Sequence, residues 1–222
     1  MKAENAGYLI WGSAGHALVL ADLLSLKGES VIALFDNNPD ASSVIDGVPL
    51  YHGAQALKKW VESQDALRGG QAAVAIGGSR GQERQSISDL LRDTGFTLPS
   101  LIHPTSYVAP SAQISDGCHL LANSMIGSGV RMMRDCIINS SANIDHECML
   151  SRGVHIAPGA TLCGCVSVGE NTMIGAGACI LPRVRIGAHC IVGAGSVVLK
   201  DVPDFSVVAG NPARTIKYTR KQ

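Results

Sequence analysis

Aliphatic residues recur at every sixth position between residues 102 and 203, without insertion or deletion. The first place of each of these seventeen hexapeptides is Ile, Leu, Val or Met, as in Ile144, and the fifth place is small, as in Cys148. A strict period of six is typical of a parallel β-helix, in which each hexapeptide supplies a short strand and a corner. Because one coil cannot bury its own core, the coils must stack. The pattern therefore predicts a β-helix domain over residues 101–203.

The pattern before the repeats is different, because apolar runs of strand length alternate with segments of helical spacing through residues 1–100. Such alternation favours a small, Rossmann-like α/β domain with a parallel sheet. The expected strands are 7–11, 31–35 and 72–76, the expected helices are 17–26, 54–67 and 82–92, and His52 is expected in a loop.

Parallel sheets of this kind bind ligands beyond the carboxyl ends of their strands, here residues 12–16, 36–37 and 77–78. The first of these ends is a glycine turn that opens a helix, and the backbone N–H groups of such a turn can hold a phosphate. It lacks the G-x-G-x-x-G spacing of dinucleotide-binding turns. On spacing alone, a plain packing turn is therefore an equal alternative.

Charge and cysteine content exclude several classes of protein. The formal net charge of the 222 residues is zero, which implies no general attraction to nucleic acid or to a membrane. Residues 176–222 nevertheless carry seven basic and two acidic side chains, so this end could meet an anionic ligand or simply form a solvated face. Seven cysteines, without a signal peptide or a segment of membrane-spanning length, predict a cytoplasmic protein without disulfide bonds or a metal site.

One histidine stands out as a candidate for catalysis. His146 occupies the third place of its hexapeptide, and since Ile144 and Cys148 point inward, its ring should lie on the outer surface. A carboxylate beside it, that of Glu147, can fix its tautomer and strengthen it as a general base. Eighteen residues later, one coil higher, Gly164 leaves space over the ring and offers a backbone N–H to a developing oxyanion. The alternative is an exposed corner without function.

A rival chemistry uses the same fold, because β-helix trimers of the carbonic anhydrase type bind zinc with three histidines at subunit interfaces. His119 and His155 are 36 residues apart, so they could lie in one column two coils apart. Such a site also needs a second histidine five residues after His155, and Ala160 occupies that place.

Three segments together carry a resemblance to a known family. They are Gly12–His16, the run Asn139–Cys148 with its sequence N-S-S-A-N-I-D-H-E-C, and the ending Val207–Arg214. With them, the whole chain resembles the hexapeptide nucleotide-sugar acetyltransferases of bacterial glycan synthesis. That family includes UDP-4-amino-sugar (bacillosamine) and GDP-perosamine N-acetyltransferases and sialic acid O-acetyltransferase-like proteins.

The resemblance implies a homotrimer of left-handed β-helices, with acetyl-CoA in the groove between neighbouring helices and residues 204–222 as a C-terminal segment. It makes His146 the general base, Glu147 its carboxylate partner and Gly164 the donor to the thioester oxygen. It also implies two binding sets: His155, Ala176 and Ala194 for acetyl-CoA, and Ala14, Gly15, His16, Asp36, Asn37 and Gly77 for the nucleotide sugar.

The expected function is acetyl-CoA-dependent N-acetylation of a nucleotide-linked amino sugar, at its C4 amine, by direct transfer without an acyl-enzyme. Two alternatives stay open: an O-acetyltransferase acting on a sialic-acid-like sugar, and a β-helix scaffold that binds a nucleotide sugar without catalysis. The resemblance leaves the sugar, the choice between UDP and GDP, and the glycan undefined, and it implies no metal.

Overall fold

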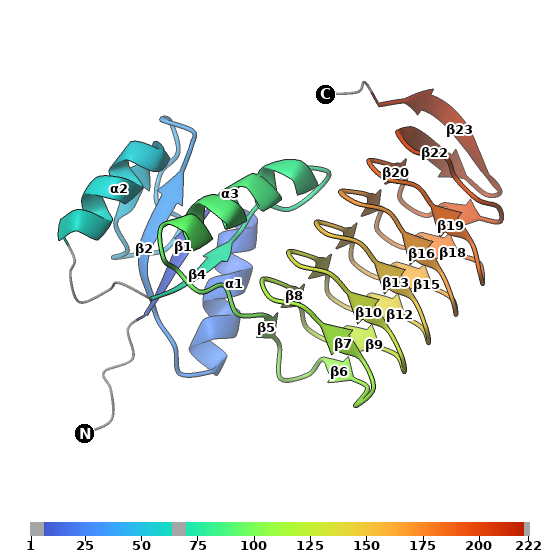
Figure 1. The fold of residues 1–222 in the computed structure, drawn as a ribbon, viewed down its shortest axis with the longest axis horizontal. Helices are drawn as coiled ribbons and strands as arrows, with labels where there is room; N and C mark the ends of the chain where they lie inside the picture. Colours follow the sequence, from blue (N-terminus) through green and yellow to red (C-terminus); the bar gives the residue numbers. More distant parts are fainter. Residues whose placement is uncertain (1–6, 64–69, 220–222) are drawn as a thin grey trace. The chain divides into compact units, whose positions relative to one another are not determined.

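The computed structural model describes residues 7–63 and 70–219, and these form two compact units (Figure 1). The first unit takes Met1–Ile76 and Ser86–Leu101, and the second takes Gly77–Gln85 and Ile102–Gln222. The segment Gly77–Gln85 therefore belongs with the repeats, although it lies within the range 1–100 of the predicted N-terminal domain. The last residues of the helix expected at 54–67 lie outside the described residues.

The first unit is built on a four-stranded parallel sheet in the order β3-β2-β1-β4. Its strands are β1 (Tyr8–Trp11), β2 (Val31–Asp36), β3 (Leu50–His52) and β4 (Gln71–Val74), and its helices are α1 (Gly15–Leu26), α2 (Gly53–Ser63) and the greater part of α3 (Gly81–Asp93). The sheet runs through an apolar core in which the Trp11 and Phe35 rings stack with centroids 5.7 Å apart. The predicted α/β alternation is thereby confirmed.

One strand of this sheet was not predicted. His52, expected in a loop, instead ends the edge strand β3, which pairs with β2 so that Leu50 lies opposite Leu34 and His52 opposite Asp36. A strand of three half-buried or exposed residues has no hydrophobic period of its own, so only its pairing with β2 defines it.

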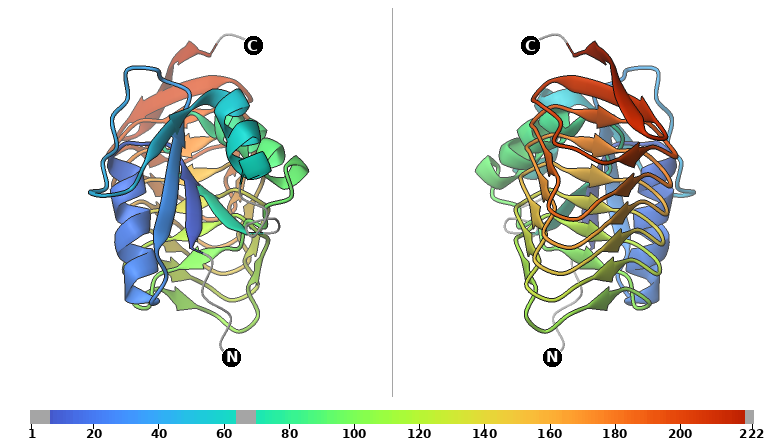
Figure 2. Two further views of the ribbon diagram at one scale, coloured as in Figure 1. Left: turned by 90° about the vertical axis from the view of Figure 1, so that its left-hand side faces the viewer. Right: turned by 90° about the vertical axis from the view of Figure 1, so that its right-hand side faces the viewer.

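The second unit is a parallel β-helix whose two-residue strands stack into three faces (Figure 2). The five-strand face contains β7 (Gln113–Ile114), β10 (Arg131–Met132), β13 (Met149–Leu150), β16 (Ser167–Val168) and β19 (Arg185–Ile186). The six-strand face contains β6 (Tyr107–Val108), β9 (Met125–Ile126), β12 (Asn143–Ile144), β15 (Thr161–Leu162), β18 (Cys179–Ile180) and β21 (Val197–Val198). The eight-strand face contains β5 (Leu101–Ile102), β8 (His119–Leu120), β11 (Ile137–Ile138), β14 (His155–Ile156), β17 (Met173–Ile174), β20 (Ile191–Val192), β22 (Ser206–Gly210) and β23 (Ala213–Tyr218).

From β6 to β18, each strand pairs with the one eighteen residues further on, so residue i lies directly below residue i+18. The first and fifth places line the core, where Ile144 and Cys148 are fully buried, as the period of six predicted. The corners depend on the fourth place, which has φ between +54° and +73° in every hexapeptide from Gly117 to Gly195. Glycine, Asn and Asp tolerate this left-handed conformation, whereas most other residues adopt it at a cost.

The C-terminal segment forms a hairpin that closes the eight-strand face. Strand β22 pairs in parallel with β20, and β23 returns antiparallel to β22. Terminal repeats need such a cover, because their outer face has no further coil to pack on. No helix within residues 7–63 and 70–219 is both long and apolar enough to cross a membrane.

Candidate active site

His146 lies at the corner between the six-strand and five-strand faces, after β12 and before β13. Its side chain is 53% exposed, which confirms the outward direction predicted from the burial of its hexapeptide neighbours. Nδ1 of the ring lies 3.1 Å from Oε2 of Glu147. In the neutral ring, this contact favours the tautomer with its proton on Nδ1, since only an N–H can donate to a carboxylate, and Nε2 then carries a lone pair.

Gly164 lies one coil above and covers the imidazole at close range. A Cβ built on Gly164 would collide with Nε2 of His146 and would lie 2.5 Å from Cε1, so no side chain fits here while the ring stays in place. The Gly164 N–H has no acceptor among the described residues, because the ladder uses only its carbonyl. By contrast, the backbone N–H of His146 donates to the carboxylate of Asp145 at 2.7 Å. The corner therefore presents a ring nitrogen and a free backbone donor side by side.

Glu147 occupies a fourth place and has φ = +57°. A residue with a Cβ pays about 1–2 kcal/mol to adopt the left-handed conformation. The same holds for Cys165, which lies one coil above at φ = +62° and has Sγ 3.8 Å from Oε2 of Glu147. Neither residue is favoured by the corner itself, and Arg183, the next residue of this column, has the same left-handed conformation with φ = +64°.

His155 begins strand β14 on the eight-strand face and is only 6% exposed. Its Nδ1 lies 3.3 Å from the carbonyl oxygen of Gly78, and its Nε2 lies 3.4 Å from Nδ2 of Asn139. Burial, and then the charge of Arg84, lower the pKa of His155 to about 4, against a smaller opposing effect of the Gly78 carbonyl. The ring is therefore neutral at physiological pH, with its proton on Nδ1 toward Gly78 and Nε2 as an acceptor.

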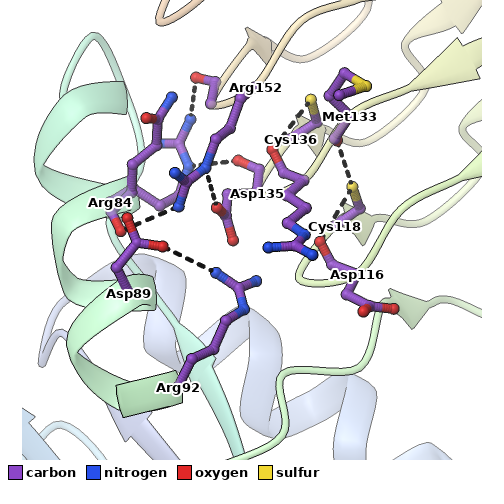
Figure 3. Close-up of polar contacts among 12 residues, drawn as sticks. Arg84, Asp89, Arg92, Asp116, Cys118, Met133, Asp135, Cys136 and Arg152 are labelled. Atoms are coloured by element: carbon purple, nitrogen blue, oxygen red, sulfur yellow. Dashed lines mark hydrogen bonds and ion pairs between the residues drawn. The ribbon is translucent and has the colours of Figure 1, made fainter.

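The segment Gly77–Gln85 is held against the β-helix by a buried arginine (Figure 3). Arg84 is fully buried and donates through Nε to the carbonyl oxygen of Asp135 at 2.8 Å, and through Nη2 to that of Gly153. The Asp135 side chain, 1% exposed, accepts from Nε of Arg152 at 3.0 Å, and Arg152 also reaches the carbonyl of Gln85. This network, which sequence reasoning missed, fixes the segment that carries Gly77 and Gly78 beside His155.

The two residues predicted to line the pantetheine, Ala176 and Ala194, are exposed and lie one above the other, since Gly195 N–H donates to Ala176 O at 2.8 Å. They stand at the corner between the eight-strand and six-strand faces, whereas His146 stands at the next corner. His155 lies on the eight-strand face itself. A single protomer thus brings His146, Glu147 and Gly164 together, and Ala176 with Ala194, but keeps these two groups at different corners.

In the first unit, the predicted nucleotide-sugar residues collect at the carboxyl ends of β1 and β2. Ala14 is the N-cap of α1 and makes no side-chain cap, so the first N–H groups of the helix are not capped from that residue. The Asp36 carboxylate accepts from the N–H of Ser13 and from that of Asn38, both at 2.8 Å, which ties the glycine turn to the end of β2. Exposed Gly15 and Asn37 and half-buried His16 lie at the same edge, while Gly77 belongs to the second unit.

The histidine column of a carbonic-anhydrase-like site is interrupted. His119 pairs with Ile137, and Ile137 pairs with His155, so an aliphatic side chain separates the two rings. Among the described residues, the group of three His, Cys, Asp or Glu donors within 4.8 Å of one another is His146, Glu147 and Cys165. The described residues of one protomer therefore do not bring three histidines together.

A cavity of about 550 Å³ lies elsewhere in the second unit, lined by Arg80, Asn171, His189 and Phe205 among others. It contains none of the predicted site residues. This cavity therefore does not coincide with the corner that carries His146.

Comparisons with known proteins decide the family. Residues 8–90 match the family model of the PglD N-terminal domain, and residues 165–200 match the bacterial transferase hexapeptide (six repeats). The structure is similar to that of PerB from Caulobacter crescentus in complex with CoA and GDP-perosamine, with 37% identity and a TM-score of 0.86 over 96% of this chain and 98% of that chain. This chain belongs to the nucleotide-sugar acetyltransferases with hexapeptide repeats.

A second member of this family gives the same result. The acetyltransferase domain of PglB from Neisseria gonorrhoeae, in complex with acetyl coenzyme A, is 32% identical, with a TM-score of 0.83 over 96% of this chain and 100% of that chain. A comparison with curated protein sequences gave no match. Family membership confirms the resemblance, the predicted fold class and the acyltransferase class. The CoA and acetyl-CoA of the relatives agree with the predicted co-substrate, whereas the roles of individual site residues stay predictions.

Proposed function

We propose that this nucleotide-sugar acetyltransferase transfers an acetyl group from acetyl-CoA to the C4 amine of a nucleotide-linked amino sugar, with His146 as the general base. The relatives support the substrate class, because PerB was solved with CoA and GDP-perosamine. The observation that carries the residue assignment is the corner where the free Nε2 of His146 lies beneath the free N–H of Gly164.

In this mechanism, Nε2 of His146 accepts a proton from the sugar amine as its nitrogen attacks the thioester carbonyl. The positive charge that grows on the ring is met by Glu147, which already accepts from Nδ1. The Gly164 N–H donates to the carbonyl oxygen as its charge develops. The carbon–sulfur bond then breaks, and the protonated His146 returns its proton to the sulfur, so that CoA leaves as the thiol and the base is regenerated. A positioned base contributes roughly 10²–10⁴-fold to the rate, and holding two substrates together contributes much of the remainder.

The proposal includes a homotrimer, because one protomer separates the groups that both contact acetyl-CoA. His146 with Gly164 and Ala176 with Ala194 stand at different corners, so neighbouring β-helices must each contribute one corner to a shared groove. His155 would then face acetyl-CoA with Nε2, the ring nitrogen that carries no proton, while Nδ1 keeps its hydrogen bond to the Gly78 carbonyl. The basic side chains of residues 176–219, including Arg183 and Lys200, would face the phosphates of CoA.

His146→Ala tests the base, with His103→Ala as the matched control, because among the described residues the His103 ring bonds only the nearby Thr105. With UDP- and GDP-linked 4-amino sugars as acceptors, we expect turnover to fall by roughly 10²–10⁴-fold in the first variant, with acetyl-CoA affinity within a few-fold, and to be unchanged in the second. Near-normal turnover of His146→Ala would refute its role.

The acceptor panel and the oligomeric state test the remaining parts. Faster reaction of a hydroxyl analogue than of the 4-amino sugar would indicate an O-acetyltransferase, and binding without CoA release from any acceptor would indicate a scaffold. A fully active monomer in sedimentation would contradict the shared groove.

A further inference from the structure

Cys165 lies beside the candidate base, although neither the repeat pattern nor the proposed reaction needs a thiol there. Its Sγ is 3.8 Å from Oε2 of Glu147, and that oxygen is 3.1 Å from Nδ1 of His146. One donor atom from each of the three lies within 4.8 Å of the other two. We propose that His146, Glu147 and Cys165 form a binding site for a soft divalent metal ion such as Zn²⁺, whose binding switches the base off.

The backbone holds the three side chains in place. Glu147 and Cys165 occupy the left-handed fourth places of stacked corners, with φ of +57° and +62°. The N–H of Cys165 donates to the carbonyl oxygen of His146 at 2.9 Å, so the two coils are joined within the cluster itself. The side chains therefore project from one corner column, and metal binding has to fix only their side-chain torsion angles.

The spacing suits a tetrahedral ion. Zinc bonds of about 2.0–2.3 Å to N, O and S require ligand atoms about 3.3–3.6 Å apart. The distances of 3.1 Å and 3.8 Å bracket this range, and the third pair of donor atoms lies within 4.8 Å. Thiolate, imidazole and carboxylate are a donor set that Zn²⁺ and Co²⁺ accept readily, with a fourth position open to water.

Binding changes the protonation of the base. The metal takes the place of the proton on Nδ1, which moves to Nε2, and the Cys165 thiol releases its proton to solvent as the metal–sulfur bond forms. His146 then carries an N–H where the mechanism needs a lone pair, and Glu147 no longer supports the ring. Loss of activity therefore rests on the proposed function, whereas metal binding itself does not.

Metal binding is tested with reduced, untagged, chelator-treated protein titrated with Co²⁺. We expect one equivalent to bind with a thiolate-to-cobalt charge-transfer band in the near ultraviolet. In Cys165→Ser the band should disappear and the affinity should fall at least about tenfold, as expected for a lost ligand. Cys163→Ser, two residues earlier on the same corner and outside the cluster, should bind like the wild type. Cys165→Ala serves as a second variant if the serine protein loses its fold by circular dichroism.

Inhibition is tested with stoichiometric Zn²⁺ and separation of the acetylated sugar, because free CoA thiol also binds zinc. Cys165→Ser should keep wild-type turnover without metal and need at least about tenfold more Zn²⁺ for half-inhibition, and chelator should restore the wild type. Equal Co²⁺ affinity in wild type and Cys165→Ser would overturn the site. Cys165-dependent Co²⁺ binding by a protein that transfers no acetyl group would support the site and refute the proposed function instead.

Discussion

Replacement of Arg84 by Met is expected to destabilise the β-helix unit strongly. The substitution removes a fully buried cation that donates to the carbonyls of Asp135 and Gly153, and it leaves the buried Asp135 carboxylate with less positive charge nearby. Breaking one side of a buried ionic network costs about 3–5 kcal/mol, because the remaining groups stay desolvated. For a chain of this length, that corresponds to a fall in Tm of roughly 6–20 °C.

Arg80→Met is the matched control, one helical turn earlier. Arg80 pairs with Glu83 at 2.6 Å, but its side chain is 63% exposed, so its loss should change stability by no more than about 0.5 kcal/mol. Far-UV circular dichroism follows the strands of the β-helix, whereas tryptophan fluorescence follows the first unit, which contains both Trp11 and Trp60. If the circular dichroism transitions of the two variants fell within about 2 °C of each other, the anchoring role of Arg84 would be wrong.

Two further predictions concern the site. Gly164→Ala should lower turnover at least about 100-fold with the fold intact, because its Cβ displaces the exposed His146 ring; unchanged kcat would contradict the packing. His155 has a folded pKa of about 4, below its unfolded value of about 6.5, so the unfolded chain binds more protons between these pH values. The contribution of His155 to the free energy of unfolding is therefore fully present above pH 6.5 and falls by about 3 kcal/mol on going to pH 4. His155→Gln should abolish this contribution, as measured by denaturant unfolding at both pH values.

The β-helix and the direction of His146 could be predicted from the sequence because the period of six leaves little freedom. Ile144 and Cys148 point inward for the same reason that every other first and fifth place does, so the third place must face out. The α/β alternation was visible for a similar reason, since buried strands such as Tyr8–Trp11 are continuous apolar runs. In both cases the apolar positions in the sequence are the positions that are buried in the structure.

The network around Arg84 could not be predicted, because nothing local distinguishes a buried arginine from a solvated one. Arg84 lies in the first turn of α3 and Arg80 directly precedes that helix, yet one is fully buried and the other exposed. The difference arises from carbonyl groups 51 and 69 residues further along the chain. The contact between Gly78 and His155 spans 77 residues and was missed for the same reason.

The fourth place of the hexapeptide supplies a signal that was available in the sequence. All of these corners from Gly117 to Gly195 are left-handed, so Gly, Asn or Asp is the expected residue at each. Five residues depart from that rule, namely Ser141, Glu147, Cys165, Arg183 and His189. Two of them, Glu147 and Cys165, lie on successive coils beside the ring of His146. The corner alone favours none of these five residues, so a departure from the rule indicates chemistry only where a candidate base lies beside it, as at Glu147 and Cys165.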